Sequence, residues 1–153
     1  MNTLTQQAGT EGTRKVDQLL AHYGESHRNP RNEVIHFIAI PLIMLSLLGL
    51  LAAIHPWVAY AFVAASMVYY ARLSLVFLLA MAVLSAIGLL LVHAMGDRVL
   101  VISAAIFVAA WIAQFVGHKI EGKKPSFFED VRFLLIGPLF VLGVLYRRWN
   151  IRY

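Results

Sequence analysis

Uncharged apolar residues fill most of the chain from residue 37 to residue 117, and this pattern predicts membrane-spanning helices. Within that stretch the acidic and basic residues are confined to Arg72 and the Asp97-Arg98 pair. A helix needs about 20 apolar residues to cross a bilayer, with a range of about 17–25. The second of the four runs is short and crosses only if its polar flanks lie among the lipid headgroups. We expect four spans, over residues of about 35–54, 57–71, 73–95 and 99–118.

Two flanking segments have amphipathic or interrupted patterns. Residues 13–24 begin with the potential cap Thr13, end with Gly24 and carry their apolar side chains on one face, which predicts an interfacial helix on the membrane surface. Residues 126–148 predict a C-terminal helix that Gly137-Pro138 kinks, because proline removes a helical hydrogen bond. We expect this helix to be re-entrant or interfacial.

The residues just before the first span predict a turn. Asn29-Pro30-Arg31-Asn32 has the residue types that favour turns, with Asn32 as the expected N-cap of the span. The predicted organisation is a disordered N-terminus over residues 1–12 and a single membrane domain over residues 13–153.

Composition supports this all-α membrane bundle and excludes other classes. The 153 residues are 60% hydrophobic and 14% charged, whereas soluble domains average about 45–50% apolar and about 25% charged residues. Cysteine is absent, which excludes disulfides, cysteine-ligated clusters and thiolate nucleophiles.

The basic residues are interpreted as signals of membrane topology. The net charge is +5, but the positive side chains lie between the apolar runs, so we expect lipid headgroups as partners and no nucleic acid. With the N-terminus in the cytoplasm and four crossings, Arg98 is the basic residue left outside, in agreement with the positive-inside rule. Both termini are then cytoplasmic. We expect a multi-pass protein of the bacterial inner membrane, with the endoplasmic reticulum as the alternative.

Histidines gather at the predicted cytoplasmic surface. His55 and His93 fall at the opposite end of the spans, whereas the other four fall at one level: His22, His27, His36 and His118. Imidazoles without thiols are typical of a site for iron, zinc, copper or nickel. The alternative is that some of them are independent interfacial histidines that form ordinary hydrogen bonds.

Polar residues on the first and fourth spans extend this candidate site. Gln114, His118 and Glu121 share one helical face, and Gln114 should face the bundle because an amide in lipid is costly. Glu121 is interpreted as a ligand, as a carboxylate that orients a ligand, or as half of a surface ion pair. Asn32 lies one turn before His36 and is expected to orient its ring.

Two separated motifs resemble a known family. The first is His27-Arg28-Asn29-Pro30-Arg31-Asn32 with His36 and Pro41, and the second runs from Trp111 to His118, followed by Glu121 and Pro125. Together with Gly137-Pro138, they resemble the small membrane proteins related to the fungal 2-hydroxy-fatty-acid dioxygenase of lipid α-oxidation.

The resemblance implies an Fe(II)-dependent dioxygenase that uses O2 to shorten a 2-hydroxy fatty acid by one carbon. It implies metal ligation by His27, His36 and His118, with Glu121 at the family's acidic position and His22 as a less closely matched ligand. Gln114 and Asn32 complete the candidate catalytic set. The alternatives are a metal-dependent lipid hydrolase or hydroxylase, and a non-enzymatic transporter or scaffold. The acyl length and the oligomeric state stay open.

Overall fold

The computed structural model describes residues 14–25, 27–122, 131 and 133–153. Throughout these residues the regular structure is helical, which confirms the all-α prediction. Thr13, the disorder predicted for residues 1–12 and the predicted start of the C-terminal helix at residue 126 lie outside the described residues. The elements are α2 (Lys15–Gly24), α3 (Pro30–Ile54), α4 (Pro56–Ala71), α5 (Leu75–Ala94), the 3-10 turn η1 (Gly96–Arg98), α6 (Val99–Glu121) and α8 (Ile136–Arg148).

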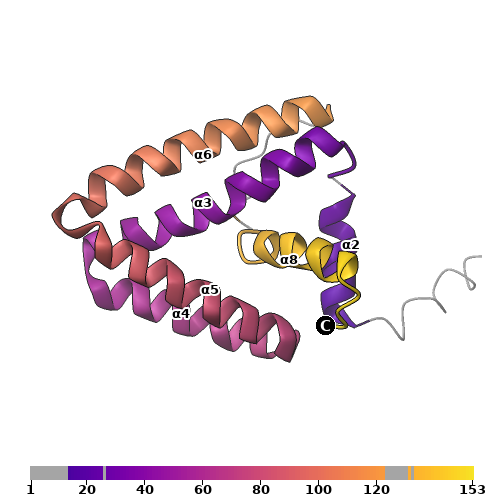
Figure 1. Cartoon of the computed structure of the whole chain (residues 1–153), viewed down its shortest axis with the longest axis horizontal. Helices are drawn as coiled ribbons and strands as arrows, with labels where there is room; N and C mark the ends of the chain where they lie inside the picture. Colours follow the sequence, from indigo (N-terminus) through magenta and orange to yellow (C-terminus); the bar gives the residue numbers. More distant parts are fainter. Residues whose placement is uncertain (1–13, 26, 123–130, 132) are drawn as a thin grey trace, which may run out of the picture.

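The long helices form two antiparallel pairs that diverge from a common end. Figure 1 shows α3 alongside α6 and α4 alongside α5, with the two pairs meeting near His55 and η1. The open side of this wedge is occupied by α2 and α8, which pack against each other. The ends of α3 and α6 that carry the predicted site therefore lie far from His55 and His93.

Three of the helices are long and apolar enough to cross a membrane, namely Pro30–Ile54, Leu75–Ala94 and Gly96–Glu121. They correspond to three of the expected spans. The helix of the remaining expected span, α4, has 16 residues and is therefore about 24 Å long. That is shorter than the hydrocarbon layer of about 30 Å, so the fourth span stays a prediction.

The beginning of α3 differs from the predicted turn. Residues 30–32 are helical, and the N-cap is Asn29, whose side-chain oxygen accepts a hydrogen bond from the Arg31 N–H at 3.0 Å. Proline at the first helical position needs no hydrogen-bond donor and already has a helical φ. The prediction of Asn32 as the cap was therefore wrong by one turn, and Asn32 instead lies inside the helix, fully buried.

Glycines allow α3 and α6 to approach closely at two levels. A Cβ atom built on Gly49 would overlap the side chain of Ser103, and one built on Gly117 would overlap the side-chain oxygen of Asn32. Small residues at a helix interface let two backbones approach, which favours packing inside membranes. The second of these contacts holds the polar ends of α3 and α6 together at the predicted site.

The flanking helices pack on protein more than the sequence pattern indicated. The apolar face of α2, formed by Val16, Leu20 and Tyr23, belongs to the same buried cluster as Leu139 and Phe140 of α8. The face expected to rest on lipid is therefore covered by α8, since burying it against apolar side chains removes it equally well from water.

The described part of the C-terminal segment is broken before α8 and not kinked within a helix. Residues 133–135 form a turn and α8 begins at Ile136, which places Pro138 in the first helical turn. Proline is tolerated there because that N–H has no partner inside the helix. The Tyr70 hydroxyl donates a hydrogen bond to the Leu135 carbonyl at 3.0 Å and so fixes this turn to α4.

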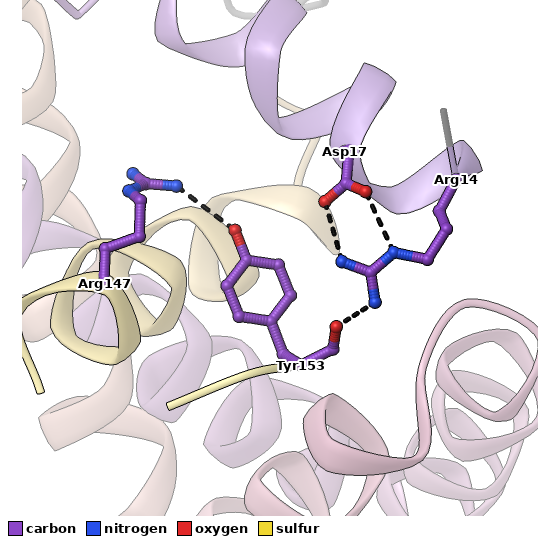
Figure 2. A network of polar contacts seen from close by, with 4 residues as sticks. All are labelled: Arg14, Asp17, Arg147 and Tyr153. Atoms are coloured by element: carbon purple, nitrogen blue, oxygen red, sulfur yellow. Dashed lines mark hydrogen bonds and ion pairs between the residues drawn. The ribbon is translucent and has the colours of Figure 1, made fainter. Parts of the chain in front are cut away.

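A polar network joins the start of α2 to the end of the chain (Figure 2). The guanidinium of Arg14 donates to both carboxylate oxygens of Asp17, at 2.9 and 3.2 Å, and to the carbonyl of Tyr153. Arg147 donates to the Tyr153 hydroxyl at 3.3 Å. The network therefore ties α2 to α8 at the end opposite to His27.

Candidate metal centre

Three histidines from separate segments converge where α3 begins and α6 ends. His27 precedes α3, His36 lies on its second turn, and His118 lies on the last turns of α6. The ring centroids are 4.2 Å apart for His27 and His36, 5.3 Å for His36 and His118, and 6.0 Å for His27 and His118. Their exposed fractions are 8%, 0% and 6%. The buried contact between these segments is therefore formed by three imidazole rings and not by apolar side chains.

Backbone carbonyls orient two of these rings. The Nδ1–H of His27 donates to the Tyr23 carbonyl at 2.7 Å, and the Nδ1–H of His36 donates to the Asn32 carbonyl at 2.9 Å. In a neutral imidazole this tautomer leaves the lone pair on Nε2, as metal-binding histidines require. His36 Nε2 is buried and has no hydrogen-bond partner among the described residues. A buried nitrogen of this kind is costly unless something binds it.

The ring separations can be compared with those expected around one shared metal ion. With metal–nitrogen bonds of about 2.1 Å, centroids of two imidazoles on one ion are expected roughly 4.5–5.5 Å apart. The separation of His36 and His118, 5.3 Å, lies within that range, whereas those of 4.2 Å and 6.0 Å lie outside it. Among the described residues, no three His, Asp or Glu side chains already have their ligand atoms in metal-binding geometry. Three clustered imidazoles therefore have the donor chemistry of a metal site, but their nitrogens are not arranged around a common point in this structure.

Glu121 fastens the start of α3 to the end of α6. Its Oε1 accepts from the backbone N–H of Arg28 at 2.9 Å, and its Oε2 accepts from the N–H of Asn29 at 2.9 Å and from the Asn32 side-chain amide at 3.0 Å. Both oxygens are engaged with α3, so the carboxylate positions the segment that carries His27 and His36.

Gln114 lies one helical turn from His118, beside a small cavity. The side chain is 3% exposed, and its Oε1 has no hydrogen-bond partner among the described residues. The cavity has a volume of about 20 Å³ and is lined by Gln114, Trp111, Tyr23 and Phe133, among other side chains. That volume accommodates a single water molecule or a small polar group.

His22 is the predicted site residue that the structure separates from the others. Its side chain is 65% exposed, its Nδ1 lies 3.5 Å from Glu25, and its ring contacts Phe133 at 5.6 Å. His27, His36, His118, Asn32 and Glu121 come together, with Gln114 next to them. His55, at the C-terminal end of α3, and His93, in the last turn of α5, are exposed.

Two residues at the site were missed from the sequence. Tyr23 stacks on His27 with ring centroids 4.3 Å apart, and its position four residues before that histidine is the signal that could have identified it. Gly117 directly precedes His118, and only a residue without a Cβ leaves room for Asn32 at that place.

Comparisons with known proteins identify the family of this chain. Residues 13–149 match the family described as "Mpo1-like: 2-hydroxy-palmitic acid dioxygenase Mpo1-like". The chain is 30% identical over 139 residues to the 2-hydroxy-palmitic acid dioxygenase MPO1 of Saccharomyces cerevisiae. The matched region covers 86% of this chain and 80% of the yeast protein. No solved structure matches the chain significantly. By the extent of both matches, this chain belongs to the Mpo1-like family.

Proposed function

We propose that this protein is an Fe(II)-dependent dioxygenase that shortens 2-hydroxy fatty acids by one carbon at the membrane surface. One O2 converts the 2-hydroxy acid into the next shorter fatty acid, with release of CO2 and water, which balances atoms and electrons. The names of the family and of the yeast relative support the substrate class. Iron is proposed because a cysteine-free, imidazole-rich donor set is compatible with iron and O2 chemistry.

The observation that carries the proposal is the buried cluster of His27, His36 and His118. His36 is fully buried, its ring centroid lies 4.2 and 5.3 Å from those of two other imidazoles, and its Nε2 has no hydrogen-bond partner in the described structure. Three histidine ligands leave coordination positions for two further groups, which suits a substrate and O2. When bound, iron would supply the activation of O2 and would bind the hydroxyl and carboxylate of the acid.

The other site residues are proposed to orient this centre. Glu121 holds the His27 segment through two backbone N–H groups, and the Asn32 carbonyl fixes the His36 ring. The Gln114 oxygen can accept a hydrogen bond from the 2-hydroxyl group of a substrate, since the adjoining cavity has room for one small polar group. A 2-hydroxy acid would then be distinguished from an unsubstituted acid, because a buried acceptor is left unpaired by the wrong ligand.

The position of the centre at the ends of α3 and α6 suits a lipid substrate. The acyl chain can stay among apolar side chains and lipid, while the polar carboxyl end reaches the buried imidazoles. We also propose that both termini and this centre lie on the cytoplasmic side, and that the protein resides in a bacterial inner membrane. Cysteine accessibility scanning of Arg98 and Arg148 substitutions tests the sidedness, since the two positions should be labelled from opposite sides.

The activity is tested on protein purified without oxygen in lipid nanodiscs and loaded with Fe(II). With 2-hydroxyhexadecanoic acid, we expect equal amounts of O2 consumed and of the C15 fatty acid formed, and no turnover of hexadecanoic acid. Products of unchanged chain length would support a hydroxylase, and cleavage of an ester without O2 uptake would support a hydrolase. Iron binding without any lipid turnover would overturn the enzymatic proposal.

A further inference from the structure

A surface groove lies beside the candidate metal centre, between α2, the end of α4 and the turn before α8. Its volume is about 460 Å³, and its walls include Lys15, Gln18 and His22 on one side and Tyr69, Phe133 and Ile136 on the other. Pockets that bind small molecules have volumes of about 300–1,000 Å³. This groove therefore has room for the carboxyl end and the first carbons of a fatty acid.

The groove has a polar wall and an apolar wall. Lys15, Gln18 and His22 follow one another at three- and four-residue steps, so they line one face of α2, and the apolar side chain of Leu19 lines the groove beside them. Tyr69 and Ile136 stand opposite them. This arrangement matches an amphiphile, whose charged end would lie along α2 while its chain contacts α4 and α8.

The charge on the polar wall is positive. Asp17 is paired with Arg14, and Glu25 lies within 3.5 Å of His22, whereas Lys15 forms no ion pair within the described residues. An ammonium group beside an apolar wall attracts a carboxylate, and the attraction is strengthened where water is partly excluded. The groove is therefore complementary to an anion that carries an apolar tail.

Phe133 separates this groove from the interior. It lines both the groove and the small cavity beside Gln114. Its ring contacts His22 on the groove side, at 5.6 Å, and Tyr23 on the inner side, at 6.0 Å. Tyr23 in turn stacks on His27. One aromatic ring thus stands between the surface groove and the side chains next to the imidazole cluster.

We propose that the surface groove binds the free 2-hydroxy fatty acid by its carboxylate near Lys15, and that Phe133 is the barrier between this position and the metal centre. The proposal rests on the proposed function, because it takes the substrate class from it. It adds a second lipid-binding position that contains none of the proposed metal ligands apart from the separated residue His22.

Photo-crosslinking tests the groove without requiring turnover. Metal-free protein in phosphatidylcholine nanodiscs is irradiated with a 2-hydroxy fatty acid that carries a diazirine on its fourth carbon, and labelled peptides are mapped by mass spectrometry. We expect the label on groove residues of α2, α4 and the turn at Phe133, with at least a fivefold decrease in Lys15→Glu. A glutamate in the first turn of α2 favours the helix dipole, so this variant should fold.

Matched variants separate charge from folding. Lys15→Arg should retain labelling, and Arg148→Glu, an exposed charge reversal at the end of α8, should leave labelling unchanged. Phe133→Ala should shift part of the label to peptides containing Trp111 or Gln114, because the barrier is removed. Labelling of the groove that resists competition by the free acid but is competed by an anionic phospholipid would overturn the choice of ligand.

The failures of the two proposals are distinguishable. If Fe(II)-loaded protein turns over the 2-hydroxy acid but the groove is unlabelled and Lys15→Glu has an unchanged KM, the groove proposal is wrong and the enzymatic proposal stands. If the groove is labelled in a Lys15-dependent way but no acid is turned over, the lipid site stands and the dioxygenase proposal is wrong.

Discussion

The side-chain amide of Asn32 donates a hydrogen bond to Glu121 across the α3–α6 interface, with a nitrogen–oxygen distance of 3.0 Å. The same asparagine contributes its carbonyl to the Nδ1–H of His36. One buried residue therefore couples the carboxylate at the end of α6 to the orientation of an imidazole on α3. Loss of a partner of this kind typically costs 10- to 100-fold in metal affinity.

Replacing Glu121 should weaken metal binding without removing a ligand. Glu121→Gln keeps the size of the side chain but loses the charge that accepts hydrogen bonds from three donors, so we expect a 10- to 100-fold lower iron affinity and a loss of roughly 1–3 kcal/mol in stability. Iron titration and thermal unfolding in detergent measure these effects. Glu33→Gln in the first turn of α3 is the control. Equal iron affinities of both variants would contradict the positioning role.

The histidines should differ sharply in their effect on metal content. His36→Ala and His118→Ala are expected to reduce iron from about one ion per chain to a trace in the folded protein, because each removes one of three proposed ligands. Elemental analysis with circular dichroism provides the measurement. His93→Ala, at the far end of α5, should retain the metal. Full retention in the first two variants would refute the shared centre.

A methyl group at Gly117 should separate α3 from α6. In Gly117→Ala the new Cβ would overlap the side-chain oxygen of Asn32 and lie 3.4 Å from His36 Cε1. Overpacking of this kind costs roughly 1–3 kcal/mol, and we expect reduced iron retention with it. Gly88→Ala is the control, because its nearest neighbour is the flexible end of Leu48, at 3.1 Å. A Gly117→Ala protein with normal stability and iron content would show that this contact is unimportant.

Gln114→Leu should lower activity without lowering stability. Removing a buried oxygen that has no hydrogen-bond partner in the described structure should leave the stability unchanged or raise it by up to about 2 kcal/mol. If Gln114 recognises the substrate hydroxyl, kcat/KM for the 2-hydroxy acid should fall at least tenfold. Thermal unfolding and steady-state kinetics test the two parts, and an unchanged kcat/KM would exclude Gln114 from recognition.

The network in Figure 2 should contribute to stability mainly through the aromatic ring of Tyr153. Asp17→Asn removes an exposed ion pair with Arg14, which is worth less than about 1 kcal/mol. Tyr153 also packs on Phe77 and Tyr146, with centroids 4.7 and 5.9 Å apart, and each aromatic pair is worth about 0.5–1.5 kcal/mol. Tyr153→Ala should therefore lower the unfolding temperature more than Asp17→Asn, and the reverse order would contradict this assignment.

The apolar runs in the sequence predicted the helices well. In lipid, backbone polar groups must be paired internally, and a helix pairs them within one apolar segment. It predicted the boundaries less well. At Asn29 and Pro30 a turn was expected from residue types that also cap and begin helices, and local preference does not distinguish the two. The apolar face of α2 likewise fits lipid or protein, and only the presence of α8 decides between them.

The residue types at the candidate site were evident from the sequence, since histidines at one end of several apolar runs are unusual and the two motifs resemble a known family. Their arrangement depends on tertiary structure. His22 and His27 are only five residues apart, yet the end of α2 between them leaves one exposed and the other buried against His36. The imidazoles converge because Gly117 permits close packing of α3 and α6 and Glu121 holds the intervening segment, and such long-range contacts have no local signature in the chain.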